Sequence, residues 1–136
     1  MATVFTGKVA IPFEKIDEYF EHMKEAEKRR EPFKRHLTQL NEDFYLYLSF
    51  KFTKKTADKH SGIVHLFIDF LCGYTDVEDI NDITKGMVNT HFKQWRKRKV
   101  WDSTTPEQQK VALHKFFIFL ANEKGTVNDK VLKALA

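Results

Sequence analysis

The sequence predicts an all-α protein, and three observations lead to that class. Apolar residues recur at three- and four-residue intervals along most of the chain, which is the spacing of one face of a helix. Only three Pro and five Gly occur among the 136 residues, so few positions interrupt a helix. The stretch "STTPEQQ" is the clearest helix start, because a Ser or Thr cap is followed by Pro106 at the first helical position.

The N-terminal third is expected to form two helices separated at Pro32. The stretch "VFTGKVAIPF" before them is interpreted as a short strand or an ordered arm, and "KEAEKRRE" as an exposed helix end. Pro32 suits the first turn of a second helix, which would continue to about Leu48 before a turn at residues 50–53. We therefore divide the chain into an N-terminal helical extension, residues 1–35, and a domain, residues 36–136. The expected apolar faces are Phe13, Ile16, Phe20 and Met23, then Phe33, Leu37, Leu40 and Phe44.

Four further helices are expected. Thr53 should cap the first of them, and Gly73 should end it in a left-handed conformation. Thr84 should cap the second, and Gly125 should end the third, which begins at Pro106. The fourth is a short helix over residues 127–135. The inward faces of the first three are expected to be Ala57, His60, Val64, Phe67, Phe70 and Leu71; Met87, Val88, Phe92 and Trp95; and Val111, His114, Phe117, Ile118 and Ala121.

The inventory of reactive side chains argues against the common enzyme and metal sites. The sequence contains no glycine-rich phosphate loop, zinc-protease motif or nucleophile elbow. No two of its six His are three or four residues apart, as ligands on one helix face would be. Cys72, the single cysteine, is expected to be a small buried hydrophobe. We therefore expect no catalytic residue, metal or cofactor, and we interpret the acidic stretch "TDVEDINDI" as a solvated connection.

The composition also bears on location and partners. No apolar run approaches the length of a membrane span, and the N-terminus lacks the apolar stretch of a signal peptide, so a cytoplasmic protein without membrane attachment is expected. The net charge of +4 and the pI near 9.1 are only mildly basic. The distribution of charge therefore matters more than its total.

A run of basic residues is the positive signal for function. In "HFKQWRKRKVW", five of the eleven residues are Lys or Arg and none is acidic. One or two bases would serve a helix C-terminus, and a larger number repel one another, so a polyanion such as the DNA backbone is the favoured partner. A solvated face, an acidic protein and a membrane surface remain alternatives. The candidate DNA-binding residues of this helix are Lys85, Lys93, Arg96, Lys97, Arg98 and Lys99.

Three stretches in the second half of the chain combine these helix signals in a familiar order. They are "KKTADKHSGIVHLFIDFLCGY", "INDITKGMVNTHFKQW" and "STTPEQQKVALHKFFIFLANEKG". Their features are an aromatic-rich helix end at Phe67, Phe70 and Leu71, a lead-in at Asp82, Ile83 and Thr84, and a doubled aromatic at Phe116 and Phe117. Over about residues 50–136 the sequence resembles the N-terminal core-binding domain of phage integrases and other tyrosine site-specific recombinases.

This resemblance implies a SAM-like orthogonal bundle of four to five helices that clamps one side of double-stranded DNA. It implies two kinds of protein partner, the catalytic domain of a parent recombinase and other recombinase subunits. The family's catalysis uses a separate domain with Arg, Lys, His and Tyr residues, so no enzyme activity is expected of this chain. His60 stands where the family often has Tyr. The DNA contacts that the resemblance adds are Lys54, Lys55, Lys59, Lys110 and Lys115.

Two other functions stay open. The chain could be a helical protein–protein interaction module without DNA binding, which would use exposed aromatic side chains such as Trp101. An enzyme with an unrecognised site is the third alternative. If DNA bases are read, the side chains suited to it are Gln94, Gln108, Gln109 and Lys110.

Overall fold

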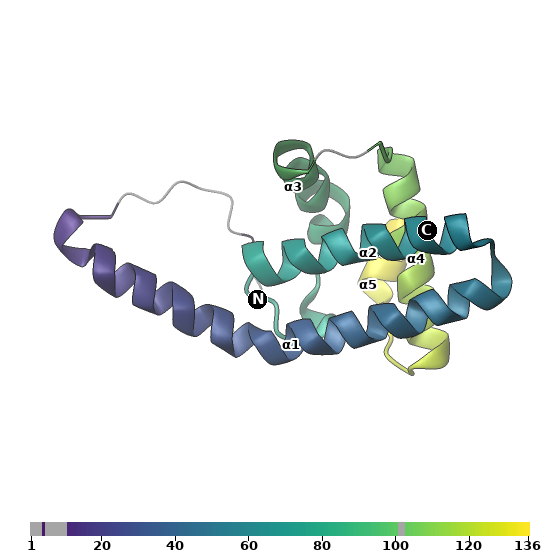
Figure 1. Ribbon diagram of the computed structural model, residues 1–136, viewed down its shortest axis with the longest axis horizontal. Helices are drawn as coiled ribbons and strands as arrows, with labels where there is room; N and C mark the ends of the chain where they lie inside the picture. Colours follow the sequence, from purple (N-terminus) through teal and green to yellow (C-terminus); the bar gives the residue numbers. More distant parts are fainter. Residues whose placement is uncertain (1–3, 5–10, 101–102) are drawn as a thin grey trace.

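The computed structural model describes residue 4, residues 11–100 and residues 103–136, with the side chain of Lys99 excepted. Five α-helices carry the architecture: α1 (Ile16–Lys51), α2 (Lys54–Tyr74), α3 (Phe92–Lys99), α4 (Pro106–Glu123) and α5 (Asp129–Leu135). Three short turns of helix join them: η1 (Phe13–Lys15), η2 (Ile80–Asp82) and η3 (Met87–His91). The described residues form no strand, only an isolated antiparallel bridge between Val4 and Thr75. The predicted all-α class is confirmed (Figure 1).

The predicted break at Pro32 is wrong, because α1 is one helix of 36 residues with Pro32 inside it. Proline lacks the N–H that would bind the carbonyl four residues earlier, and its ring crowds that carbonyl. Figure 1 shows α1 bending between its purple and blue parts, as a helix with an internal proline does. The buried apolar stripe of α1 begins directly after this point, with Phe33 and Leu37. The helix thus crosses the boundary that we drew at residue 35.

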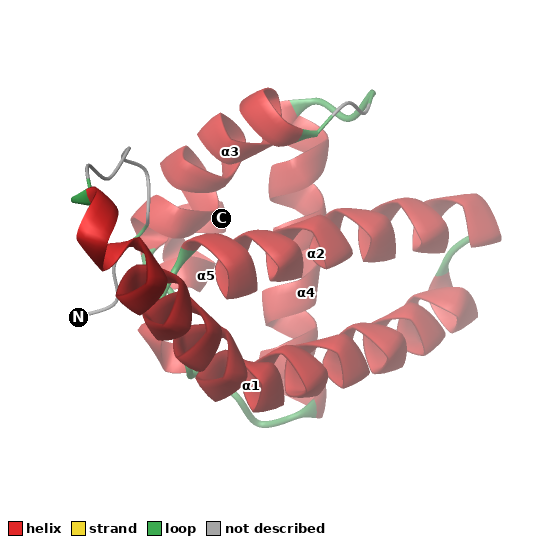
Figure 2. Cartoon of the chain, turned by 60° about the vertical axis from the view of Figure 1, so that its left-hand side comes forward, coloured by secondary structure: helices red, strands yellow, loops and turns green. Residues whose placement is uncertain are grey.

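The core forms where α2 packs against α1 on one side and against α4 and α3 on the other (Figure 2). Aromatic rings join these helices. Phe44 of α1 lies 5.2 Å from Phe116 of α4, centroid to centroid, and Phe67 of α2 lies 5.2 Å from Phe92 of α3. Burial of such large side chains is the main stabilising term for a small domain.

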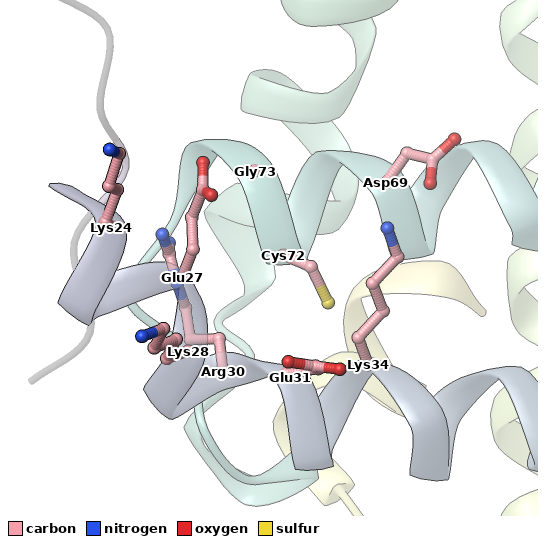
Figure 3. Close-up of a pocket in the computed structure, with 9 residues that line it drawn as sticks. All are labelled: Lys24, Glu27, Lys28, Arg30, Glu31, Lys34, Asp69, Cys72 and Gly73. Carbon is pink, nitrogen blue, oxygen red and sulfur yellow. The ribbon is translucent and has the colours of Figure 1, made fainter.

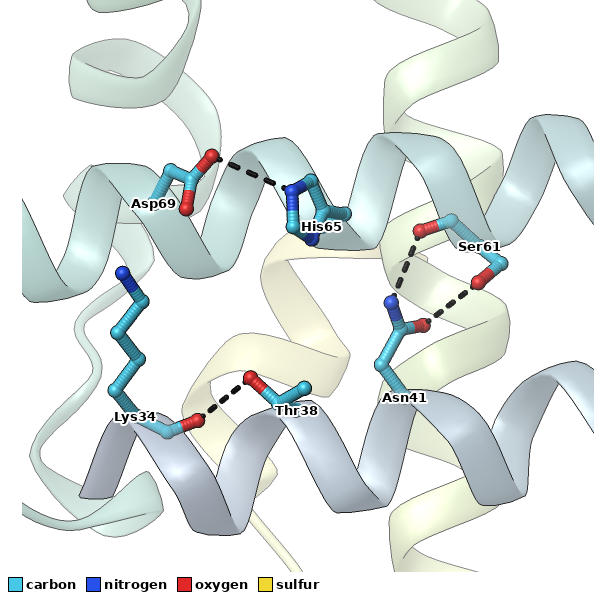
Figure 4. A network of polar contacts seen from close by, with 6 residues as sticks. All are labelled: Lys34, Thr38, Asn41, Ser61, His65 and Asp69. Carbon is cyan, nitrogen blue, oxygen red and sulfur yellow. Dashed lines mark hydrogen bonds and ion pairs between the residues drawn. The ribbon is translucent and has the colours of Figure 1, made fainter. Parts of the chain in front are cut away.

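A pair of polar side chains fixes α1 against α2. Asn41 donates from Nδ2 to the Ser61 backbone carbonyl at 3.1 Å, and Ser61 Oγ donates back to Asn41 Oδ1 at 3.2 Å (Figure 4). Asn41 is buried, so both of its polar atoms would lose free energy if they were left unpaired. This reciprocal pair sets the register of the two long helices.

Most of the predicted helix ends are confirmed. Thr53 caps α2 by accepting from the Thr56 N–H, and Thr105 forms a capping box with Gln108 at the start of α4. The Thr84 hydroxyl accepts from the Met87 N–H at 3.3 Å, and Gly125, with φ of 67°, follows the end of α4.

Gly73 is not the predicted cap. It lies inside α2, and the helix ends at Thr75, whose hydroxyl donates to the Leu71 carbonyl at 2.6 Å. The side chain of Thr75, and not a glycine in the left-handed conformation, therefore caps the C-terminal end of α2.

Two predicted apolar faces are also wrong in part. On α4, Val111 and Ile118 are exposed, whereas Phe116 and Phe119 are buried. On α1, no residue before Arg30 is buried, and Phe13 and Phe20 are 87% and 57% exposed. We call the N-terminal half of α1, residues 16–29, the arm. Residues 1–3, residues 5–10 of the predicted strand or arm, and Trp101 lie outside the described residues.

Candidate nucleic-acid interface

Three exposed cations of α3 are the first part of the candidate interface. We call Lys93, Lys97 and Arg98 the α3 basic patch; all three are exposed, and Phe92–Lys99 contains no acidic residue. Their direction is fixed by the opposite face of the helix, where Phe92 and Trp95 are buried. Trp95 packs against the ring of Phe70, with 5.7 Å between centroids. The patch is therefore carried by an anchored helix rather than by a loop.

The helix turn before α3 has a geometry that we did not predict. η3 is π-helical, so it contains one residue more per turn than an α-helix and turns the side chains that follow. It places Asn89 and Thr90 beside a groove of about 330 Å³. The groove lies between η3 and α3 on one side and the start of α4 on the other. Its lining is Asn89, Thr90, Lys93, Gln94, Arg96, Lys97, Pro106 and Gln109.

Arg96 differs from its neighbours in the basic run. Its guanidinium donates from Nη2 to the backbone carbonyl of Thr104, in the connection that leads into α4. With the Gln109 amide turned so that its oxygen faces Arg96, that oxygen also accepts from Nη1 at 3.0 Å. Gln109 is itself buried. Arg96 thus joins α3 to α4 within the chain, a role that residue type and spacing did not indicate.

We expect Arg96→Met to lower the free energy of unfolding by about 1–3 kcal/mol, because the Thr104 carbonyl and the Gln109 amide lose their partner. Lys97→Met, one residue later and exposed, should lower it by less than about 1 kcal/mol, because only a favourable charge near the helix C-terminus is lost. Urea unfolding followed by circular dichroism measures both. Equal effects of the two substitutions would show that the Arg96 contacts contribute no stability.

The second part of the interface lies where α2 begins. We call Lys54, Lys55, Lys59 and Lys115 the α2–α4 basic patch. Lys54 and Lys55 occupy the first turn of α2, which has no acidic residue, so they oppose the helix dipole. Lys115 of α4 completes the patch, with Nζ lying 4.2 Å from the Phe52 ring centroid and 3.4 Å from His60 Nε2. Cations placed against the dipole lower helix stability, which points to a role in binding.

His60 is buried beneath this patch, with no partner for Nδ1 in the described part of the chain. Burial lowers the pKa of His60, and the charges of Lys115 and Lys59 lower it further. In the unfolded chain His60 takes up a proton near pH 6.5. The unfolded state therefore binds more protons than the folded state below that pH, and acid favours unfolding.

We expect the free energy of unfolding to fall as the pH is lowered from 7.5 through 6.5 to 5.5. His60→Phe should flatten this dependence, because no proton can then be taken up at that position. The same substitution at exposed His36 is the matched control and should leave the dependence in place. Thermal melts at four pH values measure it, and a His60→Phe protein that keeps the full dependence would contradict this account.

The remaining candidate lysines lie apart from the two patches or cannot be placed. Lys85 is exposed before η3, eight residues from Lys93 of the α3 basic patch, which is roughly 12 Å along the helix. Lys110 is half-buried on α4. In sequence it directly follows Gln109, which lines the groove, and it precedes Lys115 by five residues. Lys99 ends α3, and its side chain lies outside the described part of the structure.

A second hollow lies between α1 and the end of α2, with about 470 Å³ of space (Figure 3). Arg30 lines this hollow, is only 4% exposed, and donates to the Thr75 backbone carbonyl. Four basic and three acidic residues line it, so its charges largely offset one another. Cys72 Sγ points toward α1 in Figure 3, and burial raises the pKa of this thiol, which keeps it protonated at neutral pH. Its burial was predicted and is confirmed.

Metal and membrane features are not found in the described residues. No three His, Cys, Asp or Glu side chains there lie close enough together to hold a metal ion. None of the described helices is long and apolar enough to span a bilayer. Comparison with protein-family models, with curated proteins and with solved structures gave no significant match.

Proposed function

We propose that this chain binds double-stranded DNA through its two basic patches, as the core-binding domain of a site-specific recombinase. The observation that carries the proposal is the α3 basic patch, three exposed cations on a helix without acidic residues. They are held away from the core by buried Trp95, and Lys93 and Lys97 also line the groove. Local helix stability does not require three cations there, whereas a phosphate backbone does attract them.

The groove supports duplex DNA as the partner. It presents two amide side chains, Asn89 and Gln94, beside Lys93 and Lys97. Lys and Arg hold phosphates and set the position of a protein on the duplex, while Asn and Gln can pair with the edge of adenine. An acidic protein would not need this combination.

The recombinase part of the proposal rests on the sequence resemblance over α2, α3 and α4. Under this proposal the partners are double-stranded DNA, the catalytic domain of a parent recombinase, and other recombinase subunits. The chain supplies DNA affinity and position, and the chemistry belongs to the catalytic domain.

Fluorescence anisotropy of a labelled 25-base-pair duplex, measured from 50 to 300 mM salt, tests DNA binding. The logarithm of affinity should fall linearly with the logarithm of salt concentration, by about 0.9 for each phosphate contacted. Seven cations in the two patches set an upper limit of roughly 6 for this slope. Absence of binding at 50 mM salt would contradict the proposal.

A second candidate function, protein–protein interaction, is favoured by one observation. Phe13 in η1 and Phe20 in the arm are both exposed, and no residue of the arm is buried. Large exposed aromatic side chains in neighbouring turns of the chain are a feature of docking surfaces. Association with a protein through them would be insensitive to salt, which separates this function from DNA binding.

A further inference from the structure

The turn between α1 and α2 carries the most exposed aromatic side chain of the described chain. Phe50, in the last turn of α1, is 90% exposed. Residues 48–57 contain Lys51, Lys54 and Lys55 and no acidic residue. We call Phe50 with these three lysines the turn patch. It shares Lys54 and Lys55 with the α2–α4 basic patch, and Lys115 of that patch lies against the ring of Phe52.

The neighbouring aromatic side chains are partly covered, and Phe50 is not. Lys51 Nζ lies 4.6 Å from the Tyr47 ring centroid, and Tyr47 also packs on Phe119 at 5.0 Å. Lys115 Nζ lies over one face of Phe52, which is 39% exposed. Within the described residues, Phe50 has neither a ring partner nor a cation over its face. The ring of Phe50 therefore contributes little packing to the fold, and both of its faces are open to a ligand.

The turn fixes the backbone that carries Phe50, at the end of α1. Only Phe52 and Thr53 separate the two helices, the Phe52 N–H donates to the Leu48 carbonyl at 2.8 Å, and Thr53 caps α2. Binding a partner through this ring therefore orders a side chain but little backbone. Lys51 precedes this turn and Lys54 and Lys55 follow it, so the turn fixes their backbone positions as well.

We propose that the turn patch binds DNA at an unstacked base, with the ring of Phe50 stacking on the base and Lys51, Lys54 and Lys55 holding the flanking phosphates. This inference rests on the proposed DNA-binding function. Exposed aromatic rings beside cations are the combination that binds unpaired bases, and apolar side chains also insert between base pairs where a duplex is kinked. A regular duplex offers the ring no free base face. The chain should therefore prefer a duplex with unpaired bases to a fully paired one.

Anisotropy with two 25-base-pair duplexes of the same sequence tests the preference, one fully paired and one with a central two-base bulge. We expect the wild type to bind the bulged duplex roughly 5- to 100-fold more tightly at the same salt, the range for one base stacked on an aromatic ring. Phe50→Ala should lose this preference and keep its affinity for the paired duplex. Leu46→Ala, a control at a 59% exposed apolar residue one turn earlier, should keep the preference.

The outcomes separate this inference from the proposed function. Equal binding of both duplexes by the wild type, or an unchanged preference in Phe50→Ala, would overturn the role of the turn patch alone. Binding of a single-stranded 25-mer that depends on Phe50, without binding of paired duplex, would retain the turn patch and overturn the duplex function. Phe50-dependent binding to phosphatidylserine vesicles without DNA binding would overturn both. An unchanged melting temperature of Phe50→Ala shows that the fold is intact.

Discussion

Reversing the charges of the α3 basic patch, with Lys93→Glu, Lys97→Glu and Arg98→Glu together, should weaken binding to paired duplex DNA by roughly 100-fold or more at 100 mM salt. A phosphate that the protein no longer neutralises keeps its counterions, and each new carboxylate repels the backbone. The slope of log affinity against log salt should also decrease by about 1 for each phosphate that is no longer bound. Anisotropy across salt concentrations measures both quantities on the same samples.

A matched control separates local contact from long-range attraction. Lys24→Glu, Lys28→Glu and Arg29→Glu change the net charge by the same six units, on exposed residues of the arm. This control should lower affinity by only a few-fold, because charges beyond a Debye length of about 10 Å are screened. If both triple variants lose affinity equally, net charge and not the α3 basic patch governs binding.

The triple substitution in the α3 basic patch also affects the stability of the protein. Lys97 and Arg98 lie near the C-terminal end of α3, where cations favour the helix by about 0.3–1 kcal/mol each. Their reversal should therefore lower the melting temperature slightly. Affinities are to be compared at 10 °C, where circular dichroism can confirm that both variants are folded. Arg96 is left in place because of its contacts to Thr104 and Gln109.

Local signals in the sequence predicted the class and the capped ends of helices. Thr53 acts through a residue three positions away, so sequence alone identifies it. At the start of α4 the sequence left Ser103, Thr104 and Thr105 open, and the structure has Thr105 as the cap. Pro32 misled us because proline suits the first turn of a helix but is also found inside one, where it bends the helix without ending it. The buried stripe of α1 begins after it, at Phe33 and Leu37, so the apolar pattern did not reveal that the helix continues through Pro32. The stretch "ALHKFFIFL" of α4 is apolar on more than one face, so only packing decides that Phe119 is buried and Ile118 is not.

The candidate interface was predictable to a smaller extent. Helical spacing correctly placed Trp95 inward and Lys93 and Lys97 outward. It could not distinguish Arg96 from Lys97, because the difference arises from where the connection to α4 approaches α3. Proximity of Lys115 to His60 likewise depends on the crossing of α2 and α4, fifty-five residues apart in sequence. The π-helical turn at η3 left no signal that we recognised.

Phe67→Ala should have the largest effect on the fold, a loss of about 3–5 kcal/mol in the free energy of unfolding. Phe67 is buried at the point where α2, α3 and α4 meet, with Phe92 and Phe117 rings at 5.2 and 6.3 Å. Truncation leaves a cavity that three helices must close together. For a chain of this size the melting temperature should fall by roughly 10–20 °C.

Phe20→Ala is the same truncation at a ring that is 57% exposed, and it should change the free energy of unfolding by less than about 0.5 kcal/mol. The two rings are equally apolar and both lie on predicted helix faces, so their contrast measures packing alone. A large loss from Phe20→Ala would mean that the arm is covered in solution and would support the protein-interaction function. Because Phe67 contacts Phe92 directly before the α3 basic patch, Phe67→Ala should also weaken DNA binding at temperatures where the protein is still folded. Unchanged affinity in that variant would show that the patch does not depend on the anchoring of α3 for its position.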